Sequence, residues 1–217
     1  ICDANYANDC AIDNYTLIFE GDDYVDIGGD SDLTNSLSLT YMAWINYNEY
    51  SENNVIIWDD DWEGGGDRGL EISSSGNLVA FMSFGDIVSN TSLNTNQWYH
   101  VAFVANENSR KIYINGQLDM YVSGSIDEHI GTTFISIGSG HNGYRGYFNG
   151  QIDEVRLWTR DLSISEIQYY MISKWVNSDP NLVGWWNFNA GTGTTLYDHS
   201  GNGNHGTING ATWTQNP

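Results

Sequence analysis

Proline and basic residues are scarce in this sequence. The chain has 217 residues but only 2 prolines and 7 lysines and arginines, against 28 aspartates and glutamates, for a net charge of −21. A protein that binds nucleic acid needs a basic surface to displace counterions, and anionic membranes attract the same cations. The composition therefore argues against both partners. Solubility in salty surroundings and clustering of acids around a cation would each account for the excess of acids.

Cysteines and long apolar runs are also rare. Cys2 and Cys10 are the two cysteines, and their even number in a chain rich in glycine and asparagine predicts a small disulfide-closed loop and an oxidising, extracellular setting. Two free thiols near the terminus are the alternative. No apolar run approaches the roughly 20 residues that a membrane span needs, so membrane insertion is not expected. No signal peptide is visible, and the chain starts at Ile1 as a mature fragment or an excised module would.

What the sequence does contain is many short alternating segments, separated by turns rich in its 24 glycines. Only the stretch near 163–170 looks helical, because Ser163 and Glu166 have capping-box spacing that predicts one short helical turn. The candidate strands are 15–20, 24–27, 37–46, 54–58, 69–73, 77–84, 98–105, 110–115, 117–122, 134–138, 149–158, 182–188 and one or two within 206–213. Strands at hairpin spacing without alternating helices predict an all-β fold, a two-sheet antiparallel β-sandwich of the jelly-roll type.

The stretch 149–158, NGQIDEVRLW, is the most informative of these segments. Its apolar and polar residues alternate as in a half-buried strand, which would point Asp153 and Glu154 to opposite faces. Hydrolysis of glycosides needs two carboxylates roughly 5–10 Å apart. A strand with its two acids on opposite faces, and no further acid at the right spacing, does not offer such a pair. No Ser/His/Asp constellation is evident either, so catalysis is not expected.

In order along the chain, several motifs resemble the laminin-G-like and pentraxin-like jelly rolls of the concanavalin A-like lectin/glucanase superfamily. They are LIFEGDDYVDI at 17–27, QWYHVAFVANENSRKIYING at 97–116, the strand at 149–158 with the LSISEI that follows, and WWNFNAGTGTTLYDHSGNGNHG within 182–213. The resemblance implies a concanavalin A-like sandwich over 1–217. Its C-terminal segment, 182–213, would return beside the N-terminal strands and complete a single laminin-G-like domain.

The resemblance also implies a structural Ca²⁺ ion. In the family, an acid at the position of Asp153 and the turn after the first strand commonly share one calcium, and this turn reads Glu20-Gly21-Asp22-Asp23 here. Asp22 and Asp153 are therefore the expected metal ligands, with nearby carbonyls completing the six to eight oxygens that Ca²⁺ takes. Alternatively, these acids only cap turns and solvate an edge. The family's usual aspartate before the turn glycine is Glu20 here.

Aromatic residues in loops are candidate ligand contacts, because rings pack on the CH-rich face of a sugar while amides, carboxylates and arginine bond its hydroxyls. The loop 58–68, WDDDWEGGGDR, is a candidate ligand rim, or a second cation site over 59–67, and the loop 139–149 is a candidate binding loop. Each of them is otherwise a plain solvent-exposed connection. The candidate contacts are Trp62, Arg68, His141, Asn142, Tyr144, Arg145 and Tyr147.

These observations predict a non-catalytic, extracellular carbohydrate-binding module that binds polysaccharide through loop aromatics. It would carry a structural calcium and form part of a larger secreted protein, for example a polysaccharide-degrading enzyme. The negative charge argues against sulfated or uronate glycans, unless Arg68 and Arg145 or bound Ca²⁺ reverse the field locally. A calcium-dependent adhesion or protein-interaction module is the alternative. A polysaccharide-degrading enzyme is the weaker alternative.

Overall fold

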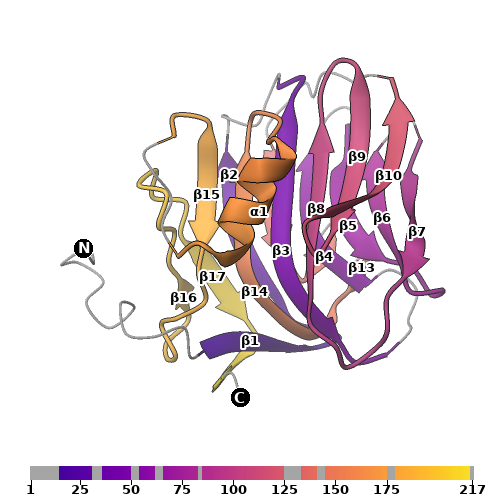
Figure 1. The fold of residues 1–217 in the computed structure, drawn as a ribbon. Helices are drawn as coiled ribbons and strands as arrows, with labels where there is room; N and C mark the ends of the chain where they lie inside the picture. The colour runs from indigo at the N-terminus through magenta and orange to yellow at the C-terminus, as the bar shows by residue number, and fades with distance from the viewer. Residues whose placement is uncertain are drawn as a thin grey trace.

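Two eight-stranded antiparallel sheets, packed face to face, make up this computed structural model (Figure 1). The structure describes residues 15–30, 36–49, 54–61, 66–82, 85–124, 133–140, 145–174 and 179–215. Sheet A has the order β10 (Gln117–Ser123), β9 (Ser109–Ile114), β8 (Tyr99–Ala105), β3 (Leu39–Tyr47), β14 (Asn149–Trp158), β1 (Tyr15–Glu20) and β18 (Thr212–Gln215), with β15 (Leu182–Trp186) also paired to β14. The all-β sandwich expected from the sequence is confirmed.

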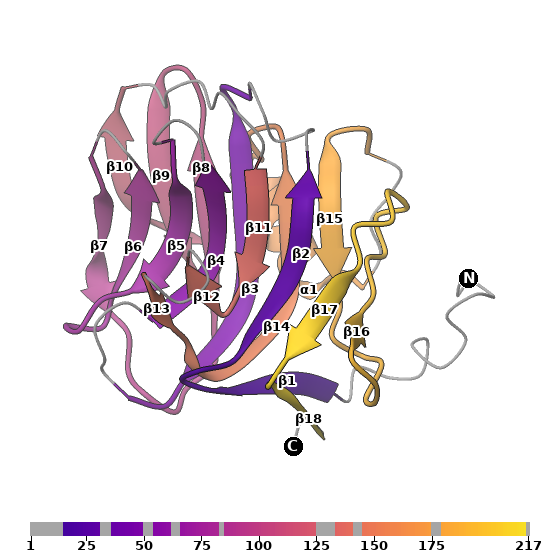
Figure 2. The same cartoon turned by 180° about the vertical axis from the view of Figure 1, so that it is seen from behind.

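Sheet B lies behind sheet A in Figure 1 and in front of it in Figure 2. Its order is β16 (Thr195–Leu196), β17 (Gly206–Asn209), β2 (Tyr24–Asp30), β11 (Thr133–Ile137), β4 (Asn54–Asp61), β5 (Arg68–Ile72), β6 (Asn77–Met82) and β7 (Ile87–Ser92). A small hairpin of β12 (Ser139–Gly140) and β13 (Gly146–Tyr147) lies over this sheet. We call the outer surface of sheet B the open face.

The interior between the sheets follows from the alternation of the strands. In β3, Tyr41, Ala43 and Ile45 are fully buried in the main core, whereas Met42 belongs to a second cluster on the outer surface of sheet A. The alternation predicted for the segment 37–46 is therefore observed. Because successive side chains of a strand point to opposite faces, each strand contributes side chains both to the core between the sheets and to the outer surface of its own sheet.

The C-terminal segment is part of the same sandwich as the N-terminal strands. β17 pairs with β2, with Ile208 opposite Val25, and β18 pairs with β1, with Trp213 opposite Leu17. Figure 2 shows β17 beside β2 at this end of the molecule. The two ends of the chain are thus joined by backbone hydrogen bonds in both sheets.

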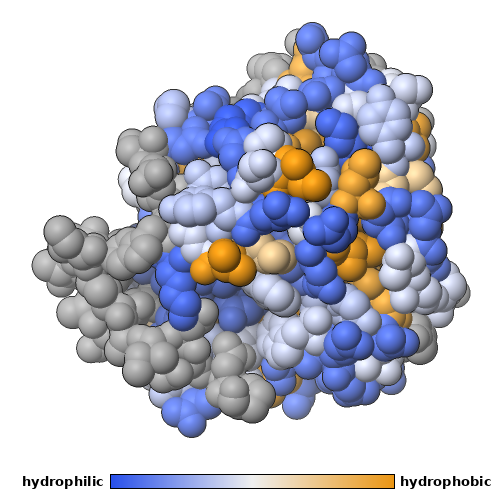
Figure 3. Space-filling model, in the orientation of Figure 1, coloured by the Kyte–Doolittle hydropathy of each residue, from blue (hydrophilic) through white to orange (hydrophobic). Residues whose placement is uncertain are grey.

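One short helix, α1 (Ile164–Ile172), crosses the outer surface of sheet A, which we call the helix-side face (Figure 1). The predicted capping box is confirmed: the Ser163 side chain accepts from the Glu166 backbone N–H, and the Glu166 carboxylate accepts from the Ser163 backbone N–H. On this face apolar side chains are scattered among polar ones (Figure 3). No helix in the described part of the chain is long and apolar enough to cross a membrane.

A β-bulge in β14 overturns one expectation. The register with β3 shifts between Asp153 and Arg156, and Glu154 has a φ of 50°. The extra residue leaves Ile152 and Val155 in the core and places both intervening acids on the helix-side face. The prediction that Asp153 and Glu154 point to opposite faces is therefore wrong, because strict alternation does not hold across a bulge.

The bulge builds a buried ionic group beneath α1, which we call the helix-side cluster (Glu154, Arg156 and Trp185). The Arg156 guanidinium pairs with Glu154 at 2.7 Å and lies 5.1 Å from the Trp185 ring centroid, and the Trp185 indole donates to Glu154 at 2.8 Å. Arg156 also donates to the backbone carbonyls of Tyr170 and Ser173 at the end of α1. The cluster therefore fastens the helix to the sheet.

The strand β7 was not predicted, because only its first residues are apolar. Its polar half is held by Asp119 of β10, whose carboxylate accepts from the backbone N–H groups of Asn90 and Thr91. This contact links the edges of the two sheets. Covering an edge strand with a charged side chain also removes a site for unwanted strand pairing.

Candidate functional site

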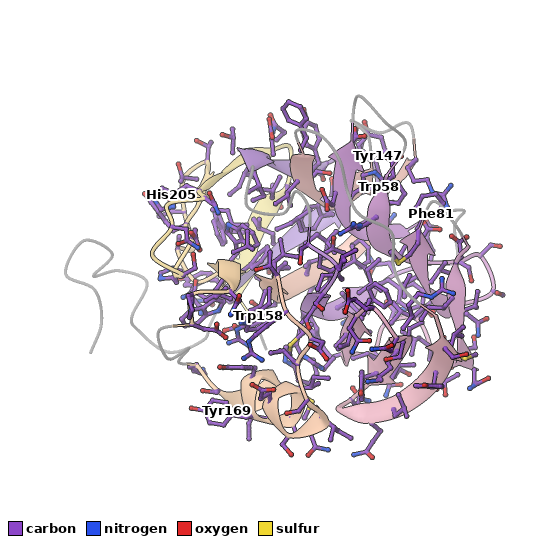
Figure 4. All side chains as sticks on the ribbon, turned by 90° about the horizontal axis from the view of Figure 1, so that it is seen from above. Trp58, Phe81, Tyr147, Trp158, Tyr169 and His205 are labelled. Atoms are coloured by element: carbon purple, nitrogen blue, oxygen red, sulfur yellow. The ribbon has the colours of Figure 1, made fainter. Side chains whose placement is uncertain are left out.

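Two aromatic rings form the base of a cluster on the open face. Trp58 of β4 lies opposite Gly69 of β5, which lies opposite Phe81 of β6. A side chain at position 69 would overlap the indole of Trp58, so the glycine lets that ring lean across β5. The two rings stack, with centroids 4.9 Å apart and planes at 28°. Figure 4 shows Trp58, Phe81 and Tyr147 gathered on one side of the molecule, away from Trp158 and Tyr169.

Arg145 lies above both rings. Its Cζ atom is 4.1 Å from the Phe81 centroid and 5.4 Å from the Trp58 centroid. Because the two ring centroids are themselves only 4.9 Å apart, the guanidinium bridges the rings rather than covering one of them. Contacts of a guanidinium with aromatic faces are favourable, and more so where water is partly excluded. Arg145 is thus the outermost group of the cluster.

Glu71 fixes the plane of this guanidinium. The Nε of Arg145 donates to Oε2 of Glu71 at 3.2 Å, and Nη2 donates to Oε1 at 3.1 Å, a bidentate pair. The Glu71 side chain is 4% exposed and that of Arg145 is 31% exposed. Burial raises the pKa of Glu71, and the hydrogen bond and charge of Arg145 oppose that rise. We call Trp58, Glu71, Phe81 and Arg145 the open-face cluster.

The hairpin β12–β13 carries Arg145 onto the sheet. The Arg145 backbone N–H donates to the carbonyl of Gly140 at 3.1 Å, and Ser139 lies opposite Tyr147 in the register. Position 140 contacts both the Arg145 side chain and the Trp58 indole so closely that a Cβ there would overlap the arginine. The glycine is needed for this close approach. As a result, Arg145 and Tyr147 lie on the same surface as the two rings.

Two of the buried donor groups that lack a partner among the described residues lie here. The Trp58 indole N–H and the Ser139 hydroxyl are buried and have no hydrogen-bond partner among the described residues. An arginine carries five N–H donors, and Glu71 takes two of those of Arg145. The other three have no partner among the residues that the structure describes. The open-face cluster is therefore a mostly buried group whose exposed part is Arg145, and three N–H donors of this arginine have no partner among the described residues.

Comparison with known proteins identifies the family of the chain that carries this face. A family profile described as the concanavalin A-like lectin/glucanases superfamily matches residues 19–168. The chain belongs to the concanavalin A-like lectin/glucanase superfamily. The matched residues contain all four members of the open-face cluster. Among curated proteins, no match to the chain is found.

Solved structures of this superfamily type share the fold at low identity. A proposed carbohydrate-binding protein of Bacteroides ovatus is 24% identical with a TM-score of 0.76, over 93% of this chain and 60% of that one. A heptameric pentraxin of Limulus polyphemus is 16% identical with a TM-score of 0.55, over 71% and 80%. Domain 4 of an extracellular arabinanase of Geobacillus stearothermophilus, solved with arabinotriose, is 18% identical with a TM-score of 0.51, over 64% and 68%.

Of the ligand contacts predicted within this superfamily fold, the structure brings two together on the open face, Arg145 and Tyr147. The other residues of that loop, His141, Asn142 and Tyr144, lie outside the described residues. So do Trp62 with its neighbours of the acidic loop and the two cysteines, Cys2 and Cys10. Their roles stay predictions.

Arg68 lies elsewhere, inside the sandwich. It is 3% exposed, stands opposite Asp59 in the register and donates to the carbonyl of Ser36 at 3.3 Å. Asp59 accepts from the Tyr41 hydroxyl at 3.2 Å, and burial raises the pKa of Asp59 to about 7 although the Arg68 charge opposes it. Alternation along β5 explains the placement, since Arg68 and Glu71 point to opposite faces. Arg68 does not lie beside Arg145, and its ligand role stays a prediction.

The two expected calcium ligands do not lie together. Glu20, at the end of β1, is opposite Asn149, and Asp22 lies in the exposed turn beyond it. The strand from Asn149 to Asp153 alone spans about 13 Å. The carboxylate of Asp153 is buried and accepts from the Glu154 backbone N–H at 2.8 Å.

These residues therefore do not fit one shared calcium site. Ligands of a single Ca²⁺ ion lie within about 2.3–2.6 Å of it, far less than the separation of Asp22 and Asp153 allows. In the described part of the chain, no group of three or more histidine, cysteine, aspartate or glutamate side chains is arranged to hold a metal. Calcium binding by other parts of the chain stays a prediction.

Sequence reasoning missed Glu71 and Phe81 as neighbours of Arg145. Trp58, the first residue of the loop predicted as a ligand rim, is 1% exposed and lies beneath that arginine. The alternation of β5 did contain a signal for Glu71, because Leu70 and Ile72 are both in the core and the residue between them must point outward. Nothing in the sequence showed that β5 lies between β4 and β6 with a glycine at the crossing point. Only the strand order brings the four cluster residues together.

Proposed function

We propose that the open face binds a glycan and does so without catalysing a reaction. The observation that carries the proposal is Arg145, which Glu71 holds over Phe81 and the buried ring of Trp58. Its guanidinium is partly exposed and has three donors without a partner among the described residues. Sugars combine hydroxyl acceptors with apolar CH faces, so a surface of donors beside aromatic rings matches their chemistry. Tyr147 adds a second, partly exposed ring beside this surface.

Two of the similar structures support this proposal. One is a proposed carbohydrate-binding protein, and the other was solved with arabinotriose. Both share the fold of this chain at an identity too low to carry over any contact. They make a saccharide a reasonable class of ligand for a sandwich of this kind, and the open-face cluster supplies the residues.

Affinity electrophoresis against a panel of neutral and acidic polysaccharides tests the proposal. We expect at least one polymer to retard the protein, and we expect Arg145→Ala and Tyr147→Ala to lose that retardation while their circular dichroism is unchanged. Tyr169→Ala is the matched control, because Tyr169 is a half-exposed tyrosine on the helix-side face. If the Arg145→Ala variant is still retarded and the Tyr169→Ala variant is not, the site lies on the helix-side face and the proposal is wrong.

The same experiment separates the other functions. A set of lanes with EDTA shows whether a divalent cation contributes to binding. Incubation of each retained polymer with the protein, followed by an assay for new reducing ends, shows whether the protein degrades it, and release of sugar would overturn the non-catalytic part of the proposal. Without retardation by any polymer, a protein-interaction module becomes the better description.

An extracellular setting is part of the same proposal. The acidic composition and the pair Cys2 and Cys10 support it. If these two cysteines form the predicted disulfide, the mass of the intact protein after alkylation without reductant should show no added alkyl group. Two added groups would indicate free thiols instead and would remove this support.

A further inference from the structure

The inference below rests on the proposed function. The N–H groups of Arg145 that Glu71 leaves free define which groups of a glycan this arginine can hold. Glu71 takes the Nε hydrogen and one Nη2 hydrogen, so the remaining donors are two on Nη1 and one on Nη2. In a planar guanidinium, one Nη1 hydrogen and the remaining Nη2 hydrogen point the same way along one edge, and the other Nη1 hydrogen points back towards Cδ. The ring contacts and the carboxylate fix the orientation of the plane, so the edge is preorganised.

Such an edge fits two oxygens side by side. A carboxylate provides them, and so do two hydroxyls on neighbouring carbons of a sugar. Shape alone does not distinguish a uronate from a neutral sugar at this position, so the local charge must decide between them.

The local charge favours the hydroxyl pair. The Glu71 carboxylate already neutralises the guanidinium, and the charge of Asp86 is close enough to raise the pKa of Glu71. Asp60 is on the same strand as Trp58 and, two residues along, on the same face. The whole chain carries a net charge of −21. An incoming carboxylate would meet a cation that is already paired and further negative charges around it.

We propose that Arg145 binds two neighbouring hydroxyls of a neutral sugar residue, and that Glu71 determines this preference by cancelling the guanidinium charge while holding its plane. Glu71 is thus a positioning residue that also sets specificity. Tyr147 lies on the same surface, where its ring can pack against the CH face of the same sugar.

The variant Glu71→Gln tests the role of the charge. Glutamine has the same size and keeps an acceptor oxygen for Arg145, but it leaves the guanidinium charge unbalanced. We expect the affinity for the best neutral polymer to change by about threefold or less. The affinity for polygalacturonate should rise by about tenfold or more, because a short-range unit charge near a surface contributes at least that much. Calorimetry at one fixed salt concentration measures both.

Arg145→Lys is the companion variant. Lysine keeps the charge but has no planar fork. Affinity for the neutral polymer should fall by about tenfold or more, as expected when hydrogen bonds to a charged group are lost. A merely structural role of Glu71 would predict equal losses on all polymers in Glu71→Gln and no change of preference.

Periodate treatment of the polymer tests the hydroxyl pair itself. Periodate cleaves the carbon–carbon bond between neighbouring hydroxyls, and borohydride reduction then removes the aldehydes formed. Binding of the treated polymer should be at least about tenfold weaker than binding of the same polymer left untreated. A linear 1,3-linked glucan, whose internal residues have no neighbouring free hydroxyls, should bind weakly before and after treatment.

The outcomes separate this inference from the proposed function. If no polymer retards the wild-type protein, the glycan-binding function fails and the inference fails with it. If a polymer binds through Arg145 but polygalacturonate binds the wild-type protein best, or periodate has no effect, the function stands and the inference is overturned. Neutral preference, periodate sensitivity and the shift in Glu71→Gln together would support it.

Discussion

The two outer faces of the sandwich carry the same combination of groups with opposite consequences. On the helix-side face, Arg156 pairs with Glu154 against the ring of Trp185. On the open face, Arg145 pairs with Glu71 against the ring of Phe81. In composition the two clusters are nearly equivalent.

What covers each arginine makes the difference. The Arg156 side chain is 2% exposed, and it donates to backbone carbonyls at the end of α1. Burial, aided by the Arg156 charge, lowers the pKa of the neighbouring His100 to about 3. No helix of the described residues covers Arg145, which is 31% exposed and keeps donors without a described partner. The comparison teaches that an arginine–glutamate pair on aromatic rings is structural or available to a ligand according to what packs over it.

The largest effect should come from removing each arginine in turn. Arg156→Met leaves Glu154 buried without its partner and should reduce the free energy of unfolding by about 3–5 kcal/mol. Arg145→Met should cost at most about 2 kcal/mol, because removing the outermost group opens Glu71 to water. Urea denaturation of both variants and the wild type measures the difference. Equal losses would mean that the two clusters are equally structural.

A third arginine, Arg68, lies between the two faces beside Asp59, and burial of Asp59 makes the interior sensitive to pH. The pKa of Asp59 is about 7 in the folded protein, above its ordinary value of 3.8, so the folded state binds more protons between these values. Stability from this group is therefore lost as the pH rises from about 4 to about 7, at about 1.4 kcal/mol per unit of pKa difference.

The variant Asp59→Asn isolates that contribution, because asparagine keeps an acceptor for Tyr41 and does not titrate. The groups that face Asp59, namely Tyr41, Arg68, Asp60 and Asp67, are unchanged in it. The difference in unfolding free energy between variant and wild type should grow in favour of the variant from pH 4 to pH 8. A difference that does not depend on pH would show that Asp59 is ionised throughout this range.

Replacing a glycine by alanine beneath each face should reduce stability by an intermediate amount and tests the same comparison. Gly69→Ala forces the Trp58 ring off its place and should cost about 1–3 kcal/mol, as overpacking does, and it should also weaken glycan binding. Gly184→Ala is the matched control, since a side chain there would overlap the Trp186 ring in sheet A. It should destabilise by a similar amount and leave binding unchanged. Loss of binding in both variants would indicate a general effect of instability.

The smallest effect should follow loss of the helix cap. Ser163→Ala removes the capping box of α1 and should cost about 1 kcal/mol, whereas Ser163→Thr should cost much less. Neither variant should change the affinity for glycan, because α1 lies on the face opposite to the open-face cluster. Thermal unfolding and calorimetry on the two variants check both statements. Weakened binding in Ser163→Ala would show that the two faces are coupled.

Local patterns in the sequence were sufficient for most elements of the fold. Alternation predicted β1 at its observed bounds and the two faces of β3, and the spacing of Ser163 and Glu166 predicted the start of α1. These features depend on the period of a strand or on a few neighbouring residues, which the sequence contains directly. The mostly polar strand β7 escaped notice because its contacts with Asp119 are non-local.

For the candidate site, the sequence by itself determined which residue types the binding loop contains. Only the tertiary structure decided which side chains from other strands lie beside them. Arg145 and Tyr147 were predicted as neighbours in one loop, but their partners Glu71 and Phe81 come from strands far away along the chain. The bulge at Glu154 likewise reversed the expected direction of a side chain. Strand order and register arise from packing of the whole sandwich, which no short segment specifies, and they determine which arginine is buried and which one faces solvent.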